Sequence, residues 1–219
     1  MTAKRGIRVW DGPTRLFHWL LVGLFAVCWW TARHDEMAPH LLSGMLLLAL
    51  LVFRLIWGLI GGSTARFHHF LAPPRAVFAY LRAKGKAARA GHNPLGAYSV
   101  VAILGLLGLQ VASGTVAVDV DGIESGPLSA FVSFDHGRLA AAAHHQLFNL
   151  LLALIALHIA AVLFYLVRGR DLLSPMITGR DRQLPPDSAA LTSVPRWRFV
   201  LATVLAAGLG WWIGHGLRF

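Results

Sequence analysis

Five long apolar runs, separated by polar connections, dominate the pattern of the chain. Most of them have the roughly 20 residues that a helix needs to cross a bilayer. The runs predict membrane-spanning helices over about 13–31, 40–59, 95–118, 144–165 and 199–213. The chain is therefore predicted to be an all-α integral membrane protein, with a four-helix transmembrane bundle followed by a fifth, C-terminal transmembrane helix.

The connections between these runs alternate in charge. The N-terminal arm, the 61–94 segment and the 168–198 linker are basic, whereas the segment 119–143 is expected to be an acidic loop. Part of the first long basic connection, residues 76–90, is expected to form a surface helix.

Counting the cations gives an orientation. With the N-terminus inside, the inner side carries 16 of the 20 Lys and Arg residues, and the outer side carries Arg33, Arg138 and Arg218. The remaining cation, Arg54, lies within a predicted span. Because basic residues stay on the cytoplasmic side, the N-terminus is predicted to be cytoplasmic and the C-terminus periplasmic.

Composition narrows the class of protein. The chain is 56% hydrophobic and only 14% charged, as expected for a small membrane protein. Its net charge of +10 follows the membrane connections, so a nucleic-acid partner is not expected. The single cysteine, Cys28, excludes an internal disulfide, and without a Cys-x-x-Cys-His motif any haem is held by coordination and packing. The first span lacks a small-residue cleavage site and is interpreted as retained.

The fourth apolar run carries histidine near both ends. His144 and His158 are 14 residues apart, which puts them within about 40° of one helix face and about 21 Å apart along the axis. His145 would point to nearly the opposite face from His158. Because an imidazole in hydrocarbon is costly unless a partner satisfies it, the pair indicates two ligands at two depths.

Two more histidines fall at the same two depths. His40 begins the second span on the outer side, as His144 does in the fourth, and His18 lies near the inner end of the first span, at the level of His158. One histidine from each of two helices, at each level, is what two six-coordinate haems require. The other interpretation, histidines that only form hydrogen bonds between helices, stays open.

Two further residues fit bound macrocycles. Gly44 follows His40 by one helical turn and leaves a flat surface beside it. Arg54 lies 14 residues after His40, on the same face and at the inner level, where it is predicted to bind a propionate of the inner haem. Its alternative role is to extend its side chain to the inner headgroups.

His92 precedes Asn93 and Pro94 at the start of the third span. Asn93 is expected to cap that helix, with Pro94 at its first position. A role for His92 at a quinone headgroup is the other interpretation, and the capping loop is favoured.

The motifs together resemble those of the bacterial di-haem membrane cytochrome b family, which includes the b-type subunits of nickel–iron hydrogenases. The resemblance covers about residues 7–182 in unbroken order. The matching segments are VWDGPTRLFHW at 9–19, HLLSG at 40–44, FRLIWG at 53–58, GHNPLG at 91–96, HHQLFNLLLALIALHIA at 144–160 and MITGRD at 176–181. It implies a four-helix core, two haems b and electron exchange with quinone, with the family's four axial ligands matching His18, His40, His144 and His158.

The chain departs from that pattern in two places. His144-His145-Gln146 stands where many members have His-Glu, so a switch of ligand to His145 stays open. The fifth span is additional, which predicts a di-haem core over 1–182 and a linker with an extra helix over 183–219. That helix is expected to pack either on the core or on the anchor helix of a partner.

These observations predict a transmembrane electron-transfer cytochrome b in the bacterial inner membrane. Its two bis-histidine haems, His18 with His158 and His40 with His144, would connect the quinone pool to an outer redox partner, either a cytochrome c or a dehydrogenase or hydrogenase subunit. Membrane lipids are expected around it, while a homodimer and quinol oxidoreductase activity stay open. The alternatives are a haem-free, histidine-lined transporter or metal site and a structural membrane-anchor subunit.

Overall fold

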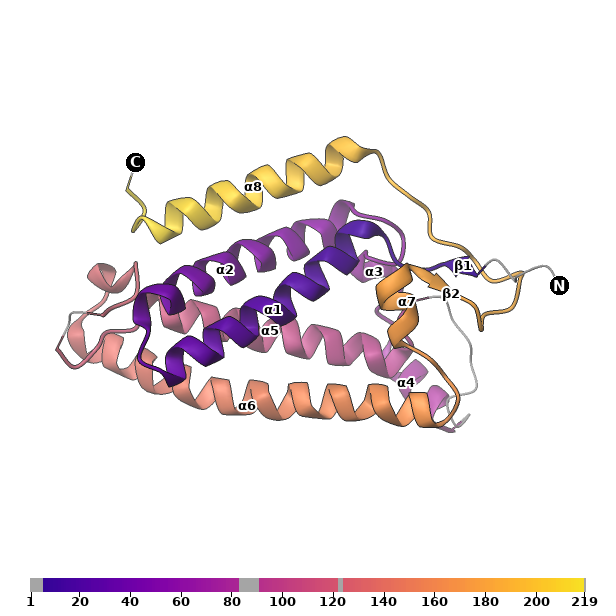
Figure 1. Ribbon diagram of the computed structural model, residues 1–219, viewed down its shortest axis with the longest axis horizontal. Coiled ribbons are helices and arrows are strands. Elements are labelled where there is room, and N and C mark those ends of the chain that lie inside the picture. The colour runs from indigo at the N-terminus through magenta and orange to yellow at the C-terminus, as the bar shows by residue number, and fades with distance from the viewer. Residues whose placement is uncertain (1–5, 83–90, 122–123, 219) are drawn as a thin grey trace. The chain divides into compact units, whose positions relative to one another are not determined.

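The five longest helices of the computed structural model correspond to the five apolar runs. The structure describes residues 6–82, 91–121 and 124–218, and five of its helices are long and apolar enough to cross a membrane. These helices are α1 (Gly12–Arg33), α2 (Met37–Ile60), α5 (Pro94–Val116), α6 (Phe134–Val167) and α8 (Arg196–Gly214), labelled in Figure 1. The prediction of an all-α integral membrane protein with a fifth C-terminal span is confirmed.

Short elements occupy the connections. α4 covers the first half of the predicted surface helix, whereas residues 83–90 lie outside the described residues. The sequence did not predict α7 or the two-residue strands β1 and β2, which pair antiparallel. The short elements are β1 (Ile7–Arg8), α3 (Phe67–Phe70), α4 (Pro74–Arg82), the 3-10 helix η1 (Ser129–Phe131), α7 (Leu173–Thr178) and β2 (Arg180–Asp181).

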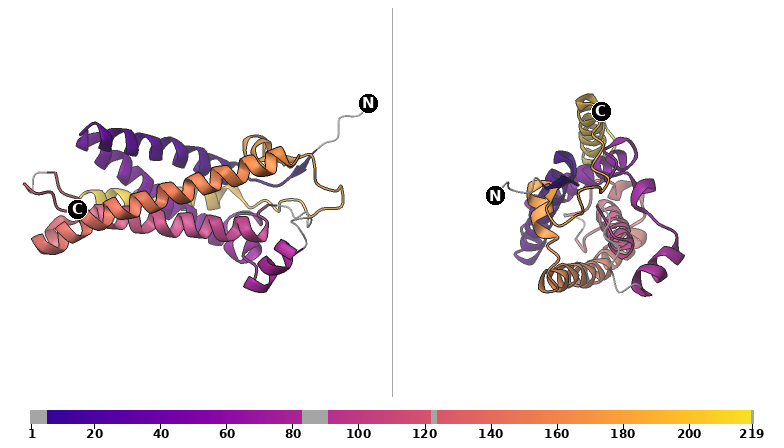
Figure 2. Two further views of the ribbon diagram at one scale, coloured as in Figure 1. Left: turned by 90° about the horizontal axis from the view of Figure 1, so that it is seen from below. Right: turned by 90° about the vertical axis from the view of Figure 1, so that its right-hand side faces the viewer.

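The predicted acidic loop over 119–143 is wrong in its last part, because α6 already begins at Phe134. The backbone N–H of His136 donates to Ser133 Oγ at 3.3 Å, which satisfies one free amide of the first turn. The segment that follows ends in four alanines, which are strong helix formers. Figure 2 shows α6 as one unbroken helix, so His144 lies three turns inside it rather than at its start.

Side-chain caps fix the starts of two other spans. Asp11 Oδ1 accepts from the backbone N–H of Thr14 at 2.8 Å at the start of α1. Asn93 Oδ1 accepts from the backbone N–H of Gly96 at 2.7 Å, with Pro94 as the first residue of α5. The predicted Asn93 cap is thereby confirmed.

The chain forms two compact units. The first unit comprises Met1–Leu16, Leu55–Ala102 and Ala156–Val200, and the second comprises Phe17–Arg54, Ile103–Ile155 and Leu201–Phe219. In the second unit, segments of α1, α2, α5 and α6 pack around a core centred on Leu47, Leu107 and Leu151. The boundary predicted near residue 182 is a different division, and it stays a prediction.

Residues of the sequence motifs at 9–19, 53–58 and 176–181 tie the first unit together. Asp11, which is 6% exposed, also accepts from Trp57 Nε1 at 3.0 Å through Oδ2. Gly179 ends α7 with a positive φ of 80°, and its carbonyl accepts from the backbone N–H of Val9 at 2.9 Å. A Cβ on Gly179 would lie 2.9 Å from the carbonyl oxygen of Trp10, so only glycine fits there.

Within the second unit, α8 packs against α2 through small residues, and Figure 1 shows the two helices running side by side. Ala202, Ala206 and Gly210, spaced by one turn, are buried. A Cβ added to Gly210 would lie only 2.9 Å from the Cβ of Ala49. Of the two positions expected from the sequence, α8 therefore takes the one on the core.

Candidate functional site

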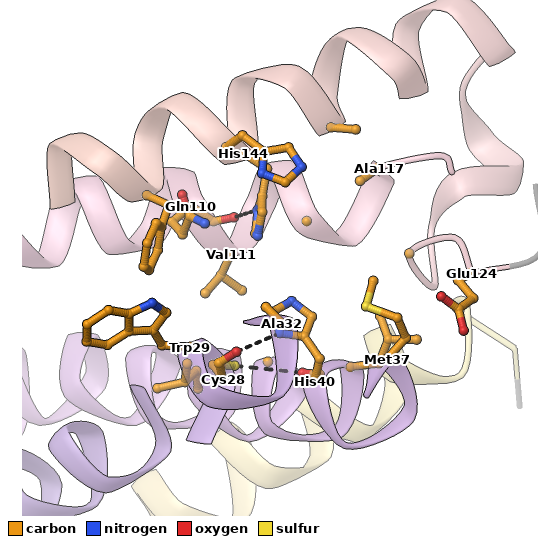
Figure 3. Close-up of a pocket in the computed structure, with 18 of the residues that line it drawn as sticks. Cys28, Trp29, Ala32, Met37, His40, Gln110, Val111, Ala117, Glu124 and His144 are labelled. Carbon is orange, nitrogen blue, oxygen red and sulfur yellow. Dashed lines mark hydrogen bonds between the residues drawn. The ribbon is translucent and has the colours of Figure 1, made fainter. Parts of the chain in front are cut away.

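A cavity of about 620 Å³ lies inside the second unit, between the helices of the bundle. Its walls come from α1, α2, α5 and α6, and its rim comes from the connections between α1 and α2 and between α5 and α6. Figure 3 shows its labelled residues. The volume falls in the range of about 300–1,000 Å³ that is typical of sites for small molecules and cofactors.

His40 and His144 face each other across this cavity, one from α2 and the other from α6 (Figure 3). Their ring centres are 6.3 Å apart, and the ring planes are nearly perpendicular at 85°. Two imidazoles on opposite sides of one metal ion, each bonded at about 2 Å through a nitrogen about 1 Å from its ring centre, have ring centres about 6 Å apart. The observed spacing fits a shared metal.

Hydrogen bonds to the main chain fix which nitrogen each ring presents. His40 Nδ1 donates to the carbonyl of Cys28 on α1 at 3.0 Å, and His144 Nδ1 donates to the carbonyl of Gln110 on α5 at 2.8 Å. A carbonyl can only accept, so each Nδ1 carries the proton and each Nε2 keeps its lone pair. This is the usual arrangement of a metal-ligating histidine and its supporting acceptor.

The same geometry distinguishes His144 from its neighbour. Ser113 Oγ lies 3.3 Å from His144 Nδ1, and a Cβ on Gly114 would lie only 2.8 Å from His144 Cε1. His144 is therefore seated against α5, and the absence of a side chain at position 114 makes room for its ring. His145 is exposed at the edge of the cavity. The geometry favours His144 as the ligand.

Two further residues of the wall bear on what the cavity can hold. A Cβ on Gly44, which lines the cavity, would have no atom within 4 Å apart from its own helix, as expected for a flat wall beside His40. Gln110 is 8% exposed, and its Oε1 has no hydrogen-bond partner among the described residues. An orphaned buried amide in the wall indicates that a bound group belongs there.

The other predicted site residues lie elsewhere. His18 is half-buried on α1 in the second unit, and His158 is half-buried on α6 in the first unit, so the pairing of these two stays a prediction. Arg54 is 2% exposed, which argues against the alternative that it extends to the headgroups. Its contact with a propionate also stays a prediction.

His92 is enclosed by aromatic rings in the first unit. Its ring centre lies 4.7 Å from that of Trp10 and 4.7 Å from that of Phe70. The position next to the Asn93 cap supports the favoured interpretation of a packed capping loop. In the described part of the chain, no group of three or more His, Cys, Asp or Glu side chains is placed to hold a metal ion by itself.

Sequence reasoning missed the residues that orient the two imidazoles. The acceptors are main-chain carbonyls of Cys28 and Gln110, and every residue type has such a carbonyl, so no side-chain pattern marks them. Gly114 was one of several glycines on α5, and only its closeness to His144 distinguishes it.

Comparison with known proteins adds one finding. The family described as prokaryotic cytochrome b561 matches residues 9–179, which include all four predicted histidine ligands. No curated protein and no solved structure matches the chain.

Proposed function

Because the chain belongs to the prokaryotic cytochrome b561 family, we propose that it holds two haems b and connects the quinone pool to a redox partner on the outer side. Membership of this family makes the chain a bacterial multi-pass membrane cytochrome that binds haem b and transfers electrons. The family match and the five apolar helices support a bacterial membrane cytochrome that binds haem b. The number of haems, the quinone, the direction and the partner belong to the proposal.

The observation that carries the proposal is the pair formed by His40 and His144. Their ring spacing of 6.3 Å and their Nδ1 bonds to the carbonyls of α1 and α5 suit two axial ligands on one iron. His40 and His144 would hold the outer haem through their Nε2 atoms. Each carbonyl acceptor keeps its imidazole in one orientation and makes the ligating nitrogen more basic.

His18 and His158 would hold the inner haem in the same way. His144 and His158 lie on one continuous helix, 14 residues apart, so the two sites are separated by about 21 Å along the axis of α6. Arg54 is buried and lies 14 residues after His40, at the level proposed for the inner haem, so it would bind a propionate on that side.

Haem b supplies a one-electron couple at each site. The chain's own contribution would be to hold each haem through two histidines, to place apolar helix faces around it, and to keep water out. Since two histidines leave no open coordination position, oxygen activation is not part of the proposed function.

The proposed orientation places the N-terminus in the cytoplasm and the C-terminus in the periplasm. The distribution of Lys and Arg supports it, and His40 and His144 then lie toward the periplasm. The redox partner is therefore proposed to be periplasmic, a cytochrome c or a dehydrogenase or hydrogenase subunit.

Stepwise reduction of the purified haem protein tests this function. A quinol should reduce haem in the wild type, and an acceptor restricted to the outer side of proteoliposomes should reoxidise it. In His144→Ala we expect quinol reduction of the remaining haem to persist and outer reoxidation to fall by at least tenfold. The matched variant His145→Ala should behave as the wild type, and the opposite result for the two variants would contradict the assignment.

A further inference from the structure

The cavity between His40 and His144 is apolar at one end and charged at the other. Phe25, Leu107 and Phe148 line one end, whereas five charged residues line the other. In Figure 3, Trp29 and Glu124 lie on opposite sides of the histidine pair. The charged residues are Arg33, Asp35, Asp119, Glu124 and Arg138.

Positions along the helices agree with this division. On α6, Phe148 follows His144 by four residues and Arg138 precedes it by six, so these two side chains start about 15 Å apart along the axis. On α1, Arg33 lies eight residues from Phe25, toward the end of the helix, about 12 Å along its axis. The charged end is thus the end nearest the helix termini and their connecting loops.

Haem b is itself amphiphilic, with methyl and vinyl groups along one edge and two carboxylates along the other. The apolar edge belongs against the phenyl rings, because burying a carboxylate there would cost several kcal/mol unless it were paired. The polarity of the cavity therefore fixes which way the carboxylates point.

Among the described residues that line the cavity, Arg33 and Arg138 are the only cations. Asp35, Asp119 and Glu124 also line the cavity and carry three carboxylates. A bound group with two more carboxylates therefore needs one of these two arginines as its partner. Arg33 is exposed, whereas Arg138 is half-buried and its Nη1 donates to the carbonyl of Val118 at 3.1 Å. A guanidinium has five N–H donors, so the fixed Arg138 keeps others for a carboxylate.

We propose that Arg138 binds a propionate of the outer haem, orients the macrocycle with its carboxylates toward the outer rim, and raises the midpoint potential of that haem. This inference rests on the proposed function of His40 and His144. A fixed positive charge disfavours the extra positive charge of the oxidised iron, so its removal favours the oxidised form.

Redox titration of the purified haem protein in detergent tests the inference. The outer haem is identified as the component missing from His144→Ala. In Arg138→Gln its equilibrium should shift toward the oxidised form by roughly tenfold, a fall of about 59 mV for one electron. Arg138→Lys keeps the charge and should retain most of the potential, and the matched control Arg218→Gln, an outer arginine that does not line the cavity, should leave it unchanged.

The outcomes separate the inference from the function beneath it. Unchanged potentials in Arg138→Gln, or equal shifts in the Gln and Lys variants, would overturn the role of Arg138 and leave the haem site standing. Loss of the outer haem in Arg138→Gln but not in Arg138→Lys supports a charged contact, whereas its loss in both variants would overturn the role given to the charge of Arg138. If His144→Ala kept all the haem of the wild type, both proposals would be overturned.

Discussion

At the scale of single residues, the position of the His144 ring depends on a missing side chain. A Cβ on Gly114 would approach His144 Cε1 to 2.8 Å, closer than real Cβ contacts come. The ring is held on that side by the Gln110 carbonyl and cannot move without losing this bond at 2.8 Å. Gly114 therefore allows α5 to approach the His144 ring closely, and its role is not to make the backbone flexible.

Gly114→Ala should accordingly displace the His144 imidazole and weaken the proposed haem site between His40 and His144. We expect lower occupancy of that haem, measured as haem b per chain after purification. Gly108→Ala is the matched control on the same helix, because a Cβ at Gly108 meets no atom within 4 Å. The control should keep its haem and gain about 0.5–1 kcal/mol of helix stability. Equal occupancy in the two variants would contradict the steric account.

The sequence predicts which histidines form the candidate site and leaves the geometry of the site open. Spacing along the apolar runs selects His40 and His144, which the structure brings together across one cavity. It does not indicate the carbonyl acceptors, the clearance at Gly114 or the orphaned amide of Gln110, because these depend on how neighbouring helices approach each other.

At the scale of elements, hydrophobic runs locate all five spans, since a helix in a bilayer is marked by length and composition alone. Their ends are less predictable. The sequence placed the start of the fourth span at His144, but a polar first turn capped by Ser133 extends α6 back to Phe134. The short α7 has too few residues for a periodic signal in the sequence. Only the structure reveals it, together with the positive φ of Gly179 at its end.

The start of α1 should be sensitive to Asp11. This buried carboxylate caps the helix through Thr14 and accepts from the indole of Trp57. Asp11→Ala removes the cap and the hydrogen bond from Trp57, each worth about 1 kcal/mol. We expect a clearly lower midpoint of thermal unfolding in detergent. Asp187→Ala, at an exposed linker position, is the matched control, and equal midpoints would contradict the structural role.

At the scale of the whole molecule, the uneven distribution of Lys and Arg, 16 on one predicted side and three on the other, supports the proposed orientation. α8 adds a fifth crossing, so the two termini are expected on opposite sides of the membrane. The sequence contains this information directly because it depends on charge counts rather than on packing.

Reporter fusions test the orientation. Alkaline phosphatase is active only in the periplasm, so it should be active when fused after Phe219 and inactive when fused after Asp187. A fluorescent protein that folds only in the cytoplasm should give the reverse pattern. Activity of phosphatase at Asp187 would place the basic linker outside and contradict the proposed positions of the two haem sites.

The most direct test of the whole account is the number of haems b per chain, determined from the alkaline pyridine spectrum of protein purified from haem-replete cells. We expect two in the wild type, one in His144→Ala and two in His145→Ala. A colourless wild type, or a haem content that His144→Ala leaves unchanged, would contradict the central claim that facing histidines of neighbouring helices bind the haem iron.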